Sequence, residues 1–172
     1  TFNKIGFDNI FIKNNLLIKS NQYLELDFSA IAKGYGVDKV SELLINNNVN
    51  NFMVEIGGEV YCHGNKLNDD WVIGLQNPFS ELGNENILKV INLKNKAMAT
   101  SGNYRNYFEI DGQKYSHTIN PQTGFPVTHN IVSVSVIAND CSSADGYATA
   151  LMVMEKEAGL KLINSISSLE AV

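Results

Sequence analysis

The sequence lacks the features that most readily assign a chain to a large functional class. It has no apolar run of about 18 residues, the length that a membrane-spanning helix requires. Its two cysteines, Cys62 and Cys141, form no CxxC pair and are too few for a disulfide framework. Its 13 basic residues are outnumbered by 18 acidic ones. The resulting net charge of −5 argues against a general nucleic-acid binder, because such proteins need a basic face to displace counterions.

What is present indicates one globular domain. The chain has 172 residues, of which 44% are hydrophobic and 18% charged, a balance typical of a folded protein. It contains no internal repeat, low-complexity segment or second domain boundary, so we expect a single domain over residues 1–172. The first residue is Thr1 rather than Met and no signal peptide is visible. We therefore expect the chain to be the C-terminal portion of a longer protein.

The hydrophobic pattern predicts an α+β fold with a largely antiparallel sheet and two helical segments. Alternating apolar and polar residues predict strands at 9–26, 51–64, 69–78, 87–102, 107–119 and 130–140. We expect 87–102 to form one strand, Asp111 and Gly112 to turn a hairpin, and 130–140 to bury one face. Helical periodicity predicts helices at 27–47 and 142–166, the second dividing in two near Gly159. The strands cluster between the helices without regular βαβ alternation, which favours the α+β class.

The first predicted helix contains an unusual pair of glycines. Ser29 is the expected N-cap, and Gly34 and Gly36 follow within the first turns. Each glycine costs a helix about 1 kcal/mol relative to alanine. Their presence predicts that another part of the chain packs closely against these turns.

The stretch SSADGYATALMVM places Asp145 and Thr149 four residues apart, on one face of the second predicted helix. One interpretation is structural: Ser142 or Ser143 caps the helix, Asp145 favours its positive end and Thr149 packs. The other is a Mg²⁺ site, because Mg²⁺ takes one or two protein carboxylates and completes its octahedron with waters, neutral oxygens and phosphates. Spacing alone leaves both open, and the second would suit a phosphorylated ligand.

Other candidate groups lie in two further segments. His117 precedes the loop INPQTGFPV, and rigid loops commonly place functional groups, although an ordinary strand histidine explains His117 alone equally well. Small-residue turns such as TSG and PQTG offer backbone N–H groups to a phosphate. Asp27, at the start of the first helix, can cap it or accept hydrogen bonds from a ligand. Lys33 is mildly disfavoured there by the helix dipole, which favours a role as partner of an anion. The GxxxxGK order of a P-loop is absent.

Five segments, taken in order, resemble the ApbE family, the FAD:protein FMN transferases. They span residues 24–154 and read LDFSAIAKGYGVD, VEIGGEVYCHG, WVIGLQNP, MATSGNYRNYFEIDGQKYSHTINPQTGFPV and VSVSVIANDCSSADGYATALMVM. The resemblance implies Mg²⁺-dependent transfer of FMN from FAD onto a threonine of an acceptor flavoprotein that carries a flavinylation motif, with release of AMP. The metal ligands that it implies are Asp145, Thr149 and the main-chain carbonyl of Ala30. The FAD contacts that it implies are Asp27, Lys33 and Ile119, and His117 matches the histidine required for transfer.

Family members extend well upstream of the matching region. The resemblance therefore implies that this chain lacks an N-terminal portion that completes the flavin-nucleotide site and carries an export signal, often of the lipoprotein type. The resemblance therefore also implies that the missing portion anchors the protein to a membrane. It implies a location in the periplasm or at the outer face of the bacterial inner membrane. Two alternatives stay open: an FAD pyrophosphatase that yields FMN and AMP, and a non-catalytic FAD-binding module. The sequence of this chain does not distinguish the transferase from these alternatives, because the nucleophile that attacks FAD is not part of the chain.

Overall fold

The computed structural model describes residues 6–80, 86–103, 107–110, 113–116 and 118–172. Within these ranges the chain forms three α-helices, α1 (Ala32–Asn46), α2 (Cys141–Val153) and α3 (Lys156–Ser165). The described strands are β1 (Ile10–Lys13), β2 (Leu16–Lys19), β3 (Phe52–Ile56), β4 (Glu59–His63), β5 (Trp71–Gln76), β6 (Ile87–Leu93), β7 (Lys96–Gly102), β8 (Tyr107–Ile110), β9 (Gln113–Ser116), β10 (Ser133–Ala138) and β11 (Glu170–Ala171).

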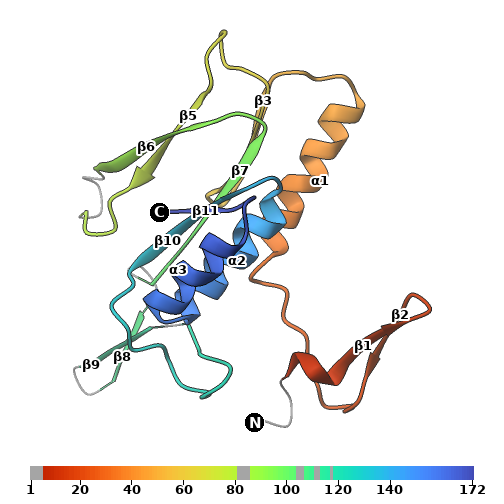
Figure 1. Cartoon of the computed structure of the whole chain (residues 1–172), viewed down its shortest axis with the longest axis vertical. Coiled ribbons are helices and arrows are strands. Elements are labelled where there is room, and N and C mark those ends of the chain that lie inside the picture. Colours follow the sequence, from red (N-terminus) through yellow and green to blue (C-terminus); the bar gives the residue numbers. More distant parts are fainter. Residues whose placement is uncertain (1–5, 81–85, 104–106, 111–112, 117) are drawn as a thin grey trace.

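One five-stranded sheet organises the molecule. Its strand order is β11-β10-β7-β4-β3, and every pairing described in it is antiparallel. The hairpins β1–β2, β5–β6 and β8–β9 form three separate two-stranded sheets (Figure 1). The predicted α+β class with largely antiparallel strands is therefore confirmed.

The two faces of the central sheet are covered by different elements. Helices α1 and α2 lie side by side against one face (Figure 1), where the core includes Val37 of α1, Ala144 and Ala148 of α2, and Val136 of β10. The hairpin β5–β6 covers the other face, and its residues form a second core cluster with β4, β7 and β10: Val60, Cys62, Leu75, Leu93, Met98 and Ile137. Small side chains on α2 let this helix lie close to both the sheet and α1.

Two strand predictions need correction. Residues 87–102 form two strands rather than one, because Asn95 takes a left-handed conformation (φ 51°) and the chain turns between β6 and β7. Strand β10 buries both faces rather than one. It lies inside the sheet, and the buried Ser135 satisfies its hydroxyl by a hydrogen bond of 2.7 Å between Oγ and Thr100 Oγ1.

The helix ends also differ from the predictions. Helix α1 begins after Ile31, and Ser29 does not cap it. The α2 cap is Asp140 rather than Ser142 or Ser143, since the Asp140 side chain accepts a hydrogen bond of 2.8 Å from the Ser143 N–H. The break between α2 and α3 falls at residues 154–155, where Met154 is extended. Gly159 lies buried inside α3, where it gives Leu151 of α2 room to pack.

The described helices are short compared with a membrane span. None of them is long and apolar enough to cross a bilayer. The length of α1, the longest at 15 residues, falls short of the roughly 20 that a bilayer core requires.

Candidate functional site

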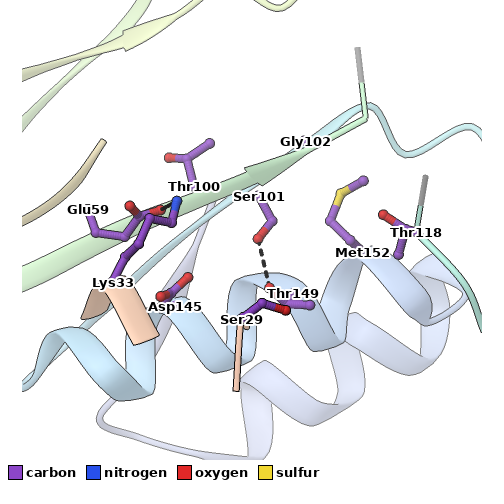
Figure 2. A pocket seen from close by; sticks show the side chains of 10 residues that line it. All are labelled: Ser29, Lys33, Glu59, Thr100, Ser101, Gly102, Thr118, Asp145, Thr149 and Met152. Atoms are coloured by element: carbon purple, nitrogen blue, oxygen red, sulfur yellow. Dashed lines mark hydrogen bonds and ion pairs between the residues drawn. The ribbon is translucent and has the colours of Figure 1, made fainter. Parts of the chain in front are cut away.

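A polar cavity of about 220 Å³ lies between the N-terminal part of α1, the middle of α2 and the C-terminal half of β7 (Figure 2). The residues that line it are Ser29, Lys33, Glu59, Thr100, Ser101, Gly102, Thr118, Asp145, Thr149 and Met152. They come from five separate stretches of the chain. The cavity is therefore a product of the tertiary fold and not of any local motif.

The cavity floor depends on a close approach of α1 to α2 at Gly34. The Gly34 N–H donates a hydrogen bond of 3.0 Å to Oδ2 of Asp145, which is buried. A Cβ atom on Gly34 would lie 2.3 Å from the carbonyl oxygen of Cys141 and 2.9 Å from the Cβ of Asp145. The predicted close packing against Gly34 is confirmed. This close packing of α1 on α2 fixes the Asp145 carboxylate at the bottom of the cavity.

A second contact from α1 anchors the start of α2. The Asp38 carboxylate accepts hydrogen bonds from the backbone N–H groups of Cys141 (2.7 Å) and Ser142 (2.8 Å), and from the Ser142 hydroxyl. These N–H groups are among the unpaired donors at a helix N-terminus, where a negative charge is also favoured by the helix dipole. Asp38 therefore holds α1 and α2 in the register that brings Gly34 to Asp145.

Replacing Asp38 with alanine should lower the free energy of unfolding by about 2 kcal/mol, because two N–H groups of α2 lose a charged acceptor. Urea unfolding measures this change, and the melting temperature should fall by about 4–8 °C. The matched control is Ser142→Ala, which leaves both backbone bonds to Asp38 intact and should cost less than half as much. Equal losses in the two variants would show that the backbone bonds to Asp38 contribute nothing.

Thr149 lies one turn beyond Asp145 on the same face of α2, and both side chains point toward β7 (Figure 2). Thr149 Oγ1 and Ser101 Oγ are 3.1 Å apart, and the hydrogen bond between them ties the helix to the strand. Because each hydroxyl can donate or accept, this bond leaves lone pairs on both oxygens for a further partner. Asp145 and Thr149 thus present two oxygen atoms toward one cavity.

An ion pair forms another wall of the cavity. Lys33 Nζ lies 2.7 Å from Oε1 of Glu59, whose side chain is only 2% exposed, while the Lys33 side chain is 47% exposed. Burial raises the pKa of Glu59, the Lys33 ammonium opposes that change, and the nearby Asp145 carboxylate adds to it. The lining thus holds two carboxylates and one ammonium, which give it a formal charge of −1.

The structure brings together three of the predicted site residues. Lys33, Asp145 and Thr149 all line the cavity, whereas Asp27, Ala30 and Ile119 are not among its lining residues. Asp27 is exposed, and hydrogen bonds from the backbone and side chain of Ser29 hold its pKa below the usual value. The roles predicted for these residues from the family resemblance stay predictions.

The remaining predicted residue, His117, lies outside the described residues. Its neighbour Thr118 lines the cavity, and the carbonyl of Thr118 accepts a hydrogen bond of 3.0 Å from the Val127 N–H. Ile119 forms a β-bridge with Pro126, so the predicted Pro- and Gly-fixed loop closes on itself beside the cavity. The role of His117 also stays a prediction.

Glu59 lines the cavity but was not among the site residues predicted from the sequence. Glu59 directly follows two glycines, Gly57 and Gly58. Both glycines have positive φ values (61° and 102°) and form the turn between β3 and β4. The Lys33 side chain packs over this turn, with its Cδ 3.3 Å from the position that a Gly57 Cβ would occupy. Gly57 therefore makes room for Lys33 to reach Glu59.

The oxygen atoms of Asp145 and Thr149 suit some divalent-cation sites and not others. Within the described residues, no group of three or more His, Cys, Asp or Glu side chains could hold a metal, which excludes a site made wholly of such ligands from that part of the chain. Mg²⁺ needs fewer protein ligands, because it keeps several waters and takes oxygens from phosphates. One carboxylate and one hydroxyl in a negatively charged cavity fit that requirement.

The fold and this cavity define a member of a known family. A family model described as the ApbE family matches residues 1–172. The chain belongs to the ApbE family.

Relatives with solved structures and curated names agree with this assignment. The chain is 44% identical over 158 residues to an FAD:protein FMN transferase from Vibrio cholerae, covering 90% of this chain and 46% of that protein. It is 39% identical to the protein of the same name from Haemophilus influenzae, covering 92% and 47% of the two chains. The apo structure of the flavinyl transferase ApbE from Pseudomonas stutzeri superimposes with a TM-score of 0.84 at 38% identity, covering 99% and 51%. The chain therefore spans about half the length of these relatives.

Proposed function

We propose that this chain forms part of an FAD:protein FMN transferase that requires Mg²⁺, transfers FMN from FAD onto a threonine of an acceptor flavoprotein, and releases AMP. The observation that carries the proposal is the convergence of Lys33, Asp145 and Thr149 on one cavity in a member of the ApbE family. Relatives that bear the transferase name support the flavin chemistry.

The charge of the cavity supports a cation as part of the site. A pyrophosphate is strongly anionic, and a lining with a formal charge of −1 would repel it. Asp145 and Thr149 would hold Mg²⁺, with the main-chain carbonyl of Ala30 as the third predicted ligand. When bound there, Mg²⁺ would neutralise the pyrophosphate and the charge that develops on it during transfer.

The residues of the chain supply orientation and proton transfer. The half-exposed Lys33 ammonium has two further N–H donors beyond its bond to Glu59, and these can bind an anionic oxygen. The Ser101 hydroxyl orients Thr149. In the proposed reaction the acceptor threonine oxygen forms a bond to the FMN phosphorus, the P–O bond to AMP breaks, and His117 accepts the hydroxyl proton.

A direct test is the mass of an acceptor flavoprotein domain after incubation with FAD, Mg²⁺ and the longest natural form of this protein. We expect the acceptor to gain the mass of one FMN, and a chelator should prevent the gain. Free FMN and AMP without an adduct would instead favour the FAD pyrophosphatase. FAD binding with neither product would favour the non-catalytic module.

The role of His117 is tested in the same assay. Replacing His117 with alanine should slow transfer by about 10²–10⁴-fold, the usual contribution of a general base. FAD affinity, measured by quenching of flavin fluorescence, should change little. A variant that loses FAD binding together with transfer would assign His117 to ligand binding instead.

A further inference from the structure

Glu59 is the one charged group of the cavity that neither the fold nor the proposed transfer explains fully. It is 2% exposed, and its Oε1 is paired with Lys33 at 2.7 Å. Its second oxygen, Oε2, is buried and has no hydrogen-bond partner among the described residues. A buried acceptor without a donor costs about 1–3 kcal/mol, and more when it is charged. A group bound in the cavity is therefore a candidate donor for Oε2.

The surroundings of Oε2 favour a positively charged partner over a neutral one. Glu59 and Asp145 line the same cavity, and the charge of Asp145 raises the pKa of Glu59, so the two carboxylates repel each other. A neutral hydroxyl donor would satisfy Oε2 without relieving this repulsion. A hydrated divalent cation would do both, because its waters are strong donors and its charge attracts both carboxylates.

We propose that Glu59 is a positioning residue for the divalent cation: Oε1 holds Lys33 at the cavity, and Oε2 accepts a hydrogen bond from a water on the cation. This proposal rests on the cation site of the proposed function and adds a residue to it. A carboxylate in this place orients the waters on the cation and strengthens cation binding without contacting the cation directly. Lys33 stays beside the cation site, where its free donors face an anionic ligand.

The test is a titration of the protein with Mn²⁺ alone, in which free Mn²⁺ is measured by its electron paramagnetic resonance signal. Glu59→Gln keeps the shape of the side chain and an acceptor for Lys33, but it removes the charge. Its Mn²⁺ affinity should fall by about 10–100-fold, the usual effect of losing an outer-sphere partner. The Mg²⁺ concentration for half-maximal transfer should rise in parallel, while the rate at saturating Mg²⁺ should change much less.

Glu55 provides a matched control on the same hairpin. It is exposed, it is not among the lining residues, and its Oε1 accepts a hydrogen bond of 2.7 Å from the Gly58 N–H. Glu55→Gln removes the same charge and keeps this acceptor, so its Mn²⁺ affinity should match that of the unmodified protein. An equal loss in both variants would attribute the effect to general charge and overturn the role of Glu59.

A second variant covers the case in which Glu59→Gln does not fold. Lys33→Met removes the ammonium and leaves both carboxylates in the cavity, so Mn²⁺ affinity should rise at pH 8 while FAD affinity falls. A fall in Mn²⁺ affinity would contradict the proposal.

If the unmodified protein binds Mn²⁺ and Glu59→Gln binds it equally well, only the role of Glu59 fails. If the unmodified protein binds no Mn²⁺, the cation site of the proposed function fails as well.

Discussion

Replacing Gly34 with alanine should destabilise the protein by on the order of 4 kcal/mol, at the upper end of what a single added methyl group does in a packed core. The new Cβ would lie 2.3 Å from the carbonyl oxygen and 2.7 Å from the carbonyl carbon of Cys141. These are backbone atoms of a helix that Asp38 holds in place, so neither can move aside cheaply. Urea unfolding should show the loss, and the melting temperature should fall by about 8–16 °C.

Gly36 offers the matched control in the same helix. A Cβ on Gly36 would meet only the Cδ1 atom of Ile56, at 3.2 Å, and that atom ends a flexible side chain. Gly36→Ala should therefore be neutral or stabilising by up to about 1 kcal/mol, because alanine favours the helix. If Gly34→Ala were as stable as Gly36→Ala, the close approach of α1 to α2 would be contradicted.

Replacing Asp145 with asparagine should reduce transfer by at least about 10²–10³-fold, the usual cost of removing one group that stabilises charge in a transition state. The amide oxygen of asparagine can still accept the Gly34 hydrogen bond, so the fold should persist while the negative charge is lost. Mn²⁺ binding should be lost together with transfer. Transfer rates and the Mn²⁺ titration measure the two effects in one preparation.

Asp140→Asn makes the same chemical change at the start of the same helix and serves as the control. Asp140 caps α2 and is not among the lining residues of the cavity. Asparagine caps helices about as well as aspartate, so this variant should keep both stability and transfer. Full activity in Asp145→Asn with an unchanged need for Mg²⁺ would assign the metal to other residues.

The sequence was sufficient to predict those parts of the fold that local patterns determine. The β1–β2 hairpin follows from alternating residues around Asn14 and Asn15, which both take the left-handed conformation that asparagine tolerates (φ 52° and 60°). The start of α1 was mistaken because Ile31 precedes the helix without a side-chain cap, and tertiary packing overrides the preference for serine. The burial of Ser135 was missed because its partner, Thr100, is 35 residues away.

The residues of the candidate site also fall into two groups, those that local spacing predicts and those that depend on contacts distant in the sequence. Asp145 and Thr149 were identified because one helix carries both, and helical spacing is visible in a sequence. Glu59 was missed because its partner Lys33 is 26 residues away, and a single glutamate after two glycines has no local signature. Ser101 was visible only as part of a small-residue turn, and its bond to Thr149 spans 48 residues. Such pairs follow from the sheet order, which local periodicity does not determine.

The hydrogen bond between Gly34 and Asp145 joins residues 111 positions apart in the chain. During synthesis, α1 leaves the ribosome long before α2, and the buried face around Val37 has no helix to cover it in the meantime. Contacts of such long range form slowly, and the exposed apolar surface is vulnerable to aggregation until they form. Because Asp145 and Thr149 both lie on α2, the proposed cation site cannot form in the nascent chain until α2 has been made.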